Sequence, residues 1–192
     1  MTAGAYDTRG FVVIEGLLEA SHVAMLDAAM DVSQRSGALA PSEYVAGAED
    51  EYSPGLGELY LRHCRPAVEA AIGCALVETY AYWRLYRKGA VLEAHTDRAS
   101  CEVTVSVTVG SDPPGQPWPF CLTDLAGETI AVTLAPGSAI IVKGHRVPHW
   151  REPLAGRVHK QMFLHYVHAG GAFAVHAFDG RGADVLGHIR GG

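Results

Sequence analysis

The sequence contains little positive charge, and nowhere is that charge concentrated. Its 192 residues include 15 Lys and Arg against 21 Asp and Glu, which gives a net charge of −6 with histidine neutral. Binding to a nucleic acid or to an anionic membrane surface calls for a basic patch. We therefore expect neither to be the main partner of this protein.

Long hydrophobic runs are also missing. The longest, such as FVVIEGLL at 11–18, are far shorter than the roughly 20 apolar residues that a helix needs to cross a bilayer. The N-terminus lacks the basic-then-apolar pattern of a secretion signal. Cysteines are few and form no CxxC pair, so a reduced, cytoplasmic location is expected and a structural zinc knot is not; the four are Cys64, Cys74, Cys101 and Cys121.

The chain is long enough for one domain with a substantial core, since 48% of its residues are hydrophobic. We expect helical support in 1–76, a β core in 77–168 and a Gly-rich tail in 169–192. No GxGxxG or Walker-type loop is present, so the common nucleotide-binding folds are not indicated.

Within the first part, a short strand is expected at 11–15, followed by a helix with Ser21 as its N-cap. Residues 36–59 are rich in Gly, Ser, Pro and acids and are expected to form a loop or a flexible cover. Helical spacing of apolar residues predicts a second helix over 61–74.

After residue 76 the pattern changes to alternation, as in CEVTVSVTVG at 101–110. About seven short strands separated by turn signals predict an antiparallel sandwich or barrel. Because the helices precede the strands instead of alternating with them, a doubly wound parallel sheet is not expected.

Two potential metal ligands share one face of an expected strand, because His95 and Asp97 in EAHTD are two residues apart. Two imidazoles and one carboxylate, with open positions left on the metal, suit non-haem Fe(II) oxygen chemistry. A second imidazole could come from His149, our first choice, or from His145.

These residues carry a resemblance to a known family. HTD at 95–97 followed by HWREP at 149–153 resembles the HxD…H triad of the 2-oxoglutarate- and Fe(II)-dependent dioxygenases. YRKGAVLEAHTD looks like a run found in their prolyl hydroxylase-like branch, and GFVVIEGLL resembles the opening of the phytanoyl-CoA hydroxylase-like branch. The turn, strand and distal histidine of LAPGSAIIVKGHRVPHWREP are also similar.

The resemblance implies a double-stranded β-helix, a jelly-roll or cupin-like core, with helices before it. It implies Fe(II) held by His95, Asp97 and His149, with 2-oxoglutarate as cosubstrate and O₂ as oxidant. The implied reaction hydroxylates an unactivated C–H bond of a small molecule, amino acid or peptide and releases succinate and CO₂.

The resemblance also implies a cation for the far carboxylate of 2-oxoglutarate, on the strand after the distal histidine. Lys160 is the first candidate and Arg157 the second. Tyr86 matches a tyrosine that often donates a hydrogen bond to the same cosubstrate. Arg98 and Arg151 each adjoin a proposed metal ligand, so they are expected either to reach a substrate carboxylate or to form surface ion pairs.

Two further functions fit the same three ligands. A zinc hydrolase could use two histidines and a carboxylate, although the sequence has no HExxH motif. A cupin-like protein could bind metal without turnover. Neither needs a cation behind the metal. The expected covers of the site are 36–59 and 111–118, whose polar and aromatic side chains suit an amino acid, a peptide or a natural product.

Overall fold

The structure is a computed structural model that describes residues 3–181. The first third of the chain holds three helices and three short strands. In order these are α1 (Ala3–Arg9), β1 (Phe11–Ile14), α2 (Ala20–Ser36), β2 (Ala40–Pro41), β3 (Ala48–Tyr52) and α3 (Gly55–Ile72). Strands make up most of the remainder: β4 (Leu76–Arg87), β5 (Leu92–His95), β6 (Val103–Asp112), β7 (Phe120–Thr123), β8 (Thr129–Val132), β9 (Ala139–Val142), β10 (His149–Arg151) and β11 (Val158–His168).

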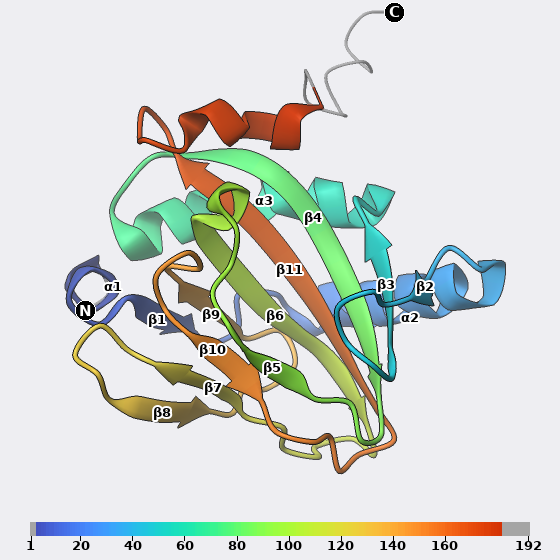
Figure 1. Cartoon of the computed structure of the whole chain (residues 1–192). Coiled ribbons are helices and arrows are strands. Elements are labelled where there is room, and N and C mark those ends of the chain that lie inside the picture. The colour runs from blue at the N-terminus through green and yellow to red at the C-terminus, as the bar shows by residue number, and fades with distance from the viewer. Residues whose placement is uncertain (1–2, 182–192) are drawn as a thin grey trace, which may run out of the picture.

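These strands form two sheets that face each other (Figure 1). Within the described residues, the larger sheet has the order β1-β9-β6-β11-β4-β3-β2 and the smaller has the order β5-β10-β7-β8. Neighbouring strands in both sheets pair antiparallel. The antiparallel two-sheet arrangement expected from the alternation is therefore present.

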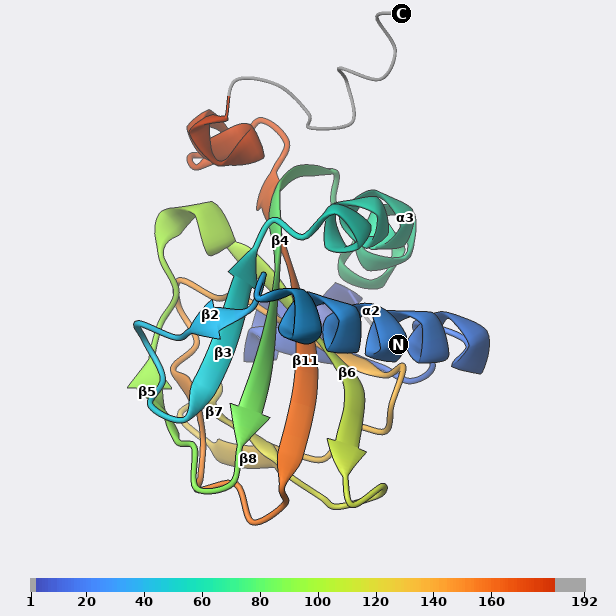
Figure 2. The same cartoon turned by 90° about the vertical axis from the view of Figure 1, so that its right-hand side faces the viewer.

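Two helices cover one side of the larger sheet. Figure 2 shows α2 in front of this sheet, with β7 and β8 behind it, and α3 contacts β4 and β11. Alternate side chains of a strand point to opposite faces. Apart from Lys160, the residues of β6 and β11 that face the helices are mostly apolar and buried. They include Val103, Val105, Val107, Met162 and Leu164.

The other side of the same two strands faces the smaller sheet and carries polar side chains. On β6 these include Thr104 and Ser106, and on β11 they include Gln161 and His165, all four of which are buried. Buried polar groups need partners. Here the partners lie across the strands: Gln161 Nε2, for example, donates to Ser106 Oγ at 2.8 Å.

The N-terminal region differs in detail from the sequence-based expectation. Helix α2 begins at Ala20 after Glu19, so Ser21 lies in its first turn and is not the N-cap. Helix α3 spans Gly55–Ile72, whereas 61–74 was expected. It therefore begins six residues earlier and ends two residues earlier than expected. Its first turn lies within the segment that was expected to be loop.

The expected loop at 36–59 also contributes β3, which pairs with β4. This strand was missed because its sequence, AEDEY, is acidic and has low β-propensity; pairing with β4 supplies what the local sequence does not. Of the expected tail, residues 174–180 form short 3₁₀ turns interrupted by a kink at 177–179, and residues 182–192 lie outside the described part. No helix among the described residues is long and apolar enough to cross a membrane.

Candidate functional site

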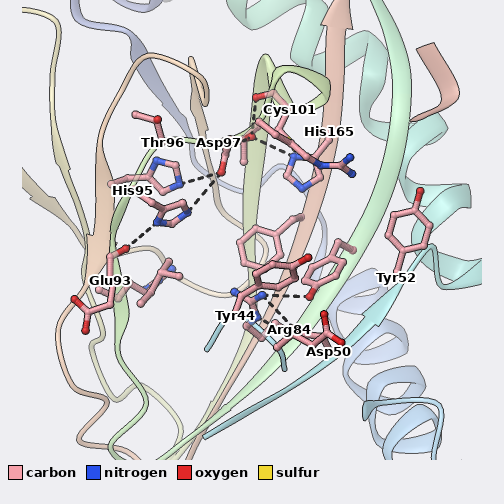
Figure 3. A pocket seen from close by; sticks show the side chains of 18 of the residues that line it. Tyr44, Asp50, Tyr52, Arg84, Glu93, His95, Thr96, Asp97, Cys101 and His165 are labelled. Carbon is pink, nitrogen blue, oxygen red and sulfur yellow. Dashed lines mark hydrogen bonds and ion pairs between the residues drawn. The ribbon is translucent and has the colours of Figure 1, made fainter. Parts of the chain in front are cut away.

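A pocket of about 870 Å³ opens between the two sheets. The three expected metal ligands line it at one end, and Arg84 and Asp50 lie at the other (Figure 3). Aromatic side chains make up much of the wall between these ends; they are Tyr44, Tyr52, Tyr80, Tyr82, Phe120 and Phe163.

Strand pairing brings the two histidines together. His95 at the end of β5 and His149 at the start of β10 are directly opposite each other in the antiparallel ladder. Asp97 follows β5, and its backbone N–H donates to Gly144 O at 2.8 Å. As a result, Nε2 of each histidine lies 3.6 Å from Asp97 Oδ1.

Hydrogen bonds to the other ring nitrogen of each histidine orient its ligand atom. Nδ1 of His95 lies 2.8 Å from Glu93 O, and Nδ1 of His149 lies 2.9 Å from Val147 O. Because a carbonyl only accepts, each Nδ1 carries a proton, and the neutral form of each ring has its lone pair at Nε2. The hydrogen bond with Asp97 raises the pKa of His95. Such backbone partners are what orient metal-binding histidines in proteins.

Asp97 is held in a similar way. Thr104 Oγ1 donates to its Oδ2 at 2.6 Å, which leaves Oδ1 for the two histidines. Burial alone would raise the pKa of Asp97, but the hydrogen bond with His95 and the nearby imidazoles hold that pKa well below its usual range. Asp97 is therefore a carboxylate.

The donor set fits a divalent transition metal. The ligand atoms of His95, Asp97 and His149 all lie within 4.8 Å of one another. Burial lowers the pKa of His149, which favours the neutral imidazole that a metal requires. Two imidazole nitrogens and one carboxylate oxygen suit Fe(II), with coordination positions left open toward the pocket. His145, the other histidine considered, packs against Phe173 instead, with ring centroids 5.0 Å apart.

Arg151 places a buried positive charge in this pocket. It lies two residues after His149, lines the same pocket and is 2% exposed. Its guanidinium stacks over Trp118, 4.6 Å from the ring centroid, and donates to Trp118 O and to Gln161 Oε1. No carboxylate of the described residues pairs with it. Burial lowers its pKa to about 10, which reflects the cost of a desolvated charge without a counter-ion.

The structure does not bring the two expected cosubstrate cations to the pocket. Lys160 is on the helix-facing side of β11, where its Nζ donates to Asp27 Oδ1 at 2.8 Å and to Asp31 Oδ1 at 2.6 Å, both on α2. Arg157 precedes β11 and pairs with Asp112 at 2.6 Å, with its side chain 75% exposed. Neither residue lines the pocket in this structure.

Tyr86 and Arg98 are the two other residues that the sequence analysis expected near the cosubstrate or substrate. Tyr86 is fully buried, with its ring 4.8 Å from that of Trp118, and its hydroxyl accepts a hydrogen bond from Arg84 Nη1 at 3.5 Å. Arg98 lines the pocket at its rim, where it pairs with Asp179 at 2.8 Å and lies over the ring of Tyr80. Arg98 thus has the surface ion pair that was expected as one alternative, whereas Arg151 does not.

Several pocket residues were not anticipated. Arg84 is buried and forms a bidentate pair with Asp50, at 2.5 and 3.2 Å; alternation along β4 would have placed it on one face with Tyr82 and Tyr86. Thr104 and His165 were missed because the partner each one needs lies on another strand. Of the expected covers, 36–59 contributes Tyr44 and Tyr52 to the lining, whereas Trp118 of 111–118 is buried under Arg151.

Comparison with solved structures shows the fold. Over 85% of this chain and 96% of the other, the structure resembles a Pseudomonas putida prolyl-4-hydroxylase with a TM-score of 0.69 and 18% identity. The chain has the fold of the 2-oxoglutarate- and Fe(II)-dependent oxygenases. The expected mainly β architecture with a jelly-roll core and N-terminal helices is thereby confirmed, as is the resemblance at the level of the fold.

Two other solved structures share this fold. The non-haem α-ketoglutarate-dependent epimerase SnoN from nogalamycin biosynthesis matches with a TM-score of 0.72 and 15% identity, over 95% of this chain and 90% of the other. HygX from Streptomyces hygroscopicus, with nickel, 2-oxoglutarate and hygromycin B bound, matches with a TM-score of 0.67 and 14% identity, over 85% and 84%. No protein-family model and no curated protein sequence matches the chain.

Proposed function

We propose that this protein is a 2-oxoglutarate- and Fe(II)-dependent oxygenase that hydroxylates an unactivated C–H bond. The observation that carries the proposal is the presence of two complementary sites in one pocket. One is a set of two histidines and a carboxylate, and the other is a buried arginine for which residues 3–181 provide no counter-ion. A dianion that binds a metal at one end and a guanidinium at the other matches both.

Arg151 is the residue that we assign to the far carboxylate of 2-oxoglutarate. A buried, unpaired cation is costly, and a bound carboxylate would remove that cost through a bidentate, charge-assisted contact. Arg84, the other buried arginine, already has Asp50 as its counter-ion. Tyr86 remains our candidate hydrogen-bond donor to the cosubstrate, since its ring packs against Trp118, over which the Arg151 guanidinium also lies.

His95, Asp97 and His149 would hold the metal, and Thr104 would fix the orientation of Asp97. With Fe(II) and 2-oxoglutarate bound, O₂ would supply the oxidant for a C–H bond, and succinate and CO₂ would be released. The protein's own part is to direct Nε2 of both histidines toward the metal by binding their Nδ1 atoms to backbone carbonyls, to hold the carboxylate ionised, and to keep bulk water from the buried His149 and Arg151.

The substrate that we propose is a small molecule, an amino acid or a peptide. Proteins of this fold have been crystallised with hygromycin B and, for a prolyl hydroxylase from Trichoplax adhaerens, with a peptide fragment. The tyrosine-rich wall of the pocket suits a substrate with ring or apolar surface. A cytoplasmic location agrees with the four free cysteines.

The test is release of succinate by purified protein supplied with Fe(II), 2-oxoglutarate and ascorbate, since such an oxygenase turns over its cosubstrate slowly even without substrate. Binding of 2-oxoglutarate should be measured by calorimetry in the same samples, with Zn(II) in place of iron. If protein confirmed to hold metal shows no succinate release and no 2-oxoglutarate binding, the proposal is refuted. That result would favour a metal-binding protein or a hydrolase.

A further inference from the structure

His165 lies in the pocket beside the metal ligands without belonging to them. It is on β11, 6% exposed, and lines the pocket. In the two ladders of β11 it is opposite Tyr80 on one side and Thr104 on the other. Its Nδ1 lies 3.1 Å from Thr104 Oγ1, and its Nε2 has no partner among the described side chains and points into the pocket (Figure 3).

The hydrogen bonds of Thr104 determine which nitrogen of His165 carries the proton. A threonine hydroxyl has one hydrogen to donate. Here that hydrogen goes to Asp97 Oδ2 at 2.6 Å, because an ionised carboxylate accepts but cannot donate. Thr104 Oγ1 can therefore only accept from His165, so Nδ1 is the protonated nitrogen and Nε2 carries a lone pair.

Burial keeps the ring in this neutral form. The pKa of His165 is lowered to about 4, chiefly because burial disfavours the imidazolium. An acceptor that faces a pocket and has no protein partner is available to a donor group of a ligand. The unpaired lone pair is thus a feature that a bound molecule with a donor group would satisfy.

Aromatic rings flank the imidazole and restrict what can reach Nε2. The ring of Tyr80 lies 4.6 Å from that of His165, and the ring of Phe163 is nearly parallel to it at 6.4 Å. A flat group packs well against such faces, with its polar edge directed at the nitrogen. Tyr80 is itself held in place, since its hydroxyl lies 3.1 Å from Cys101 Sγ.

We propose that His165 Nε2 accepts a hydrogen bond from the substrate and that the substrate carries a hydroxyl on a flat, unsaturated or aromatic ring. His165 is then a specificity residue, tied through Thr104 to the same carboxylate that holds the metal. The inference rests on the proposed function for its meaning, because it names the substrate class of that site. The hydrogen-bond geometry on which it depends does not require turnover.

The experiment uses full-length protein labelled with ¹⁵N-histidine and loaded with Zn(II) and 2-oxoglutarate. Long-range ¹H–¹⁵N correlation spectra report the protonation of each ring nitrogen, and the His165→Phe variant assigns the signals by their loss. We expect protonated Nδ1 and bare Nε2. A spectrum that shows the proton on Nε2, or on both nitrogens at neutral pH, would overturn the proposal.

Phenol and anisole then serve as matched probes, because they share a ring and only phenol has a donor. Phenol should shift the Nε2 signal and bind about tenfold more tightly than anisole, the value of one ordinary hydrogen bond. In His165→Phe the preference for phenol should vanish. Equal affinities in the wild type, or a phenol complex that leaves the Nε2 signal unchanged, would refute the role of His165.

The two proposals can fail separately. Absence of succinate release and of 2-oxoglutarate binding, together with a phenol-sensitive Nε2, would refute the oxygenase and leave the donor-recognition site in place. Succinate release together with equal affinities for phenol and anisole would support the oxygenase and refute the role of His165 in substrate recognition.

Discussion

Arg151 and His149 are two residues apart on β10, and both side chains are buried in the same pocket. One short strand therefore carries a proposed metal ligand and the proposed anion-binding cation. Their separation is fixed by the backbone of a single paired strand, which is more precise than a separation set by two loops. The chain thereby defines how long a molecule must be to bridge metal and guanidinium.

The first prediction concerns the cation. Arg151→Gln should raise the Kd for 2-oxoglutarate by about 30-fold or more, since removing a partner from a buried charge-assisted pair costs at least about 2 kcal/mol. Arg151→Lys should recover part of the affinity, because it keeps the charge and loses the bidentate geometry. Calorimetry on the Zn(II)-loaded protein measures both.

The control for Arg151 is Lys160→Gln. Lys160 pairs with Asp27 and Asp31 of α2, away from the pocket. The change should leave the Kd for 2-oxoglutarate unaltered and lower the free energy of unfolding by about 1 kcal/mol or less, as for a partly exposed ion pair. A Lys160 variant that loses 2-oxoglutarate affinity while Arg151→Gln retains it would return the role to Lys160.

The second prediction concerns the carboxylate ligand. Asp97→Ala should weaken metal binding more than about 100-fold, because even outer-shell changes at metal sites cost 10–100-fold. Titration with Co(II), followed by its visible absorption, gives the affinity. Glu128→Gln, which removes a surface acid paired with Arg9, is the matched control and should bind Co(II) like the wild type. Undiminished Co(II) affinity of Asp97→Ala would exclude this aspartate from the site.

The third prediction tests the packing behind Asp97. A Cβ on Gly144 would contact Asp97 Oδ2 and lie 2.7 Å from Thr104 Oγ1, so the carboxylate would have to move. Gly144→Ala should therefore lower metal affinity by about 10-fold or more, comparable to loss of an outer-shell contact. Gly55→Ala, at a position with open space around it, should have no such effect.

The fourth prediction concerns acid stability. Burial lowers the pKa of His159 to about 3, and its Nε2 is paired with Gln161 Oε1 at 2.7 Å. Below about pH 6.5 the unfolded chain protonates this histidine while the folded protein does not. Its contribution is thus complete above pH 6.5 and is lost as the pH falls, at about 1.4 kcal/mol per pH unit until about pH 3.

Urea denaturation between pH 7 and 4 measures this linkage. The His159→Asn variant should show a shallower loss of stability with falling pH than the wild type, because one proton-binding group of the unfolded state has been removed. Parallel curves for the two proteins would show that His159 is not held neutral by the fold.

Most strands after residue 76 could be predicted, and the alternation is long and regular along β4 and β6. The three-residue β10 was not predicted because it is too short to show a period. The acidic β3 could not be predicted either, since its pairing partner β4 is remote in sequence. The same distinction applies to the site. His95 and Asp97 are a local pair on one strand and its continuation, whereas Thr104 and His165 gain their roles from side chains on other strands.

The cation proposed for the 2-oxoglutarate carboxylate shows most clearly what could not be predicted from the sequence. Both faces of β11 are buried, and each face carries apolar and polar residues. The sequence of this strand therefore does not show on which side of the sheet Lys160 lies. Packing against α2 directs Lys160 outward, and pairing of β10 with β5 and β7 directs Arg151 inward.

The sequence by itself determined that helices precede a β core and fixed the spacing of the three candidate ligands, because both follow from local periodicity and residue type. Tertiary structure decided which cation faces the ligands and which acceptor faces the pocket. Those choices depend on the side of a sheet to which each strand turns its residues, and that side is set by contacts between segments far apart in the chain.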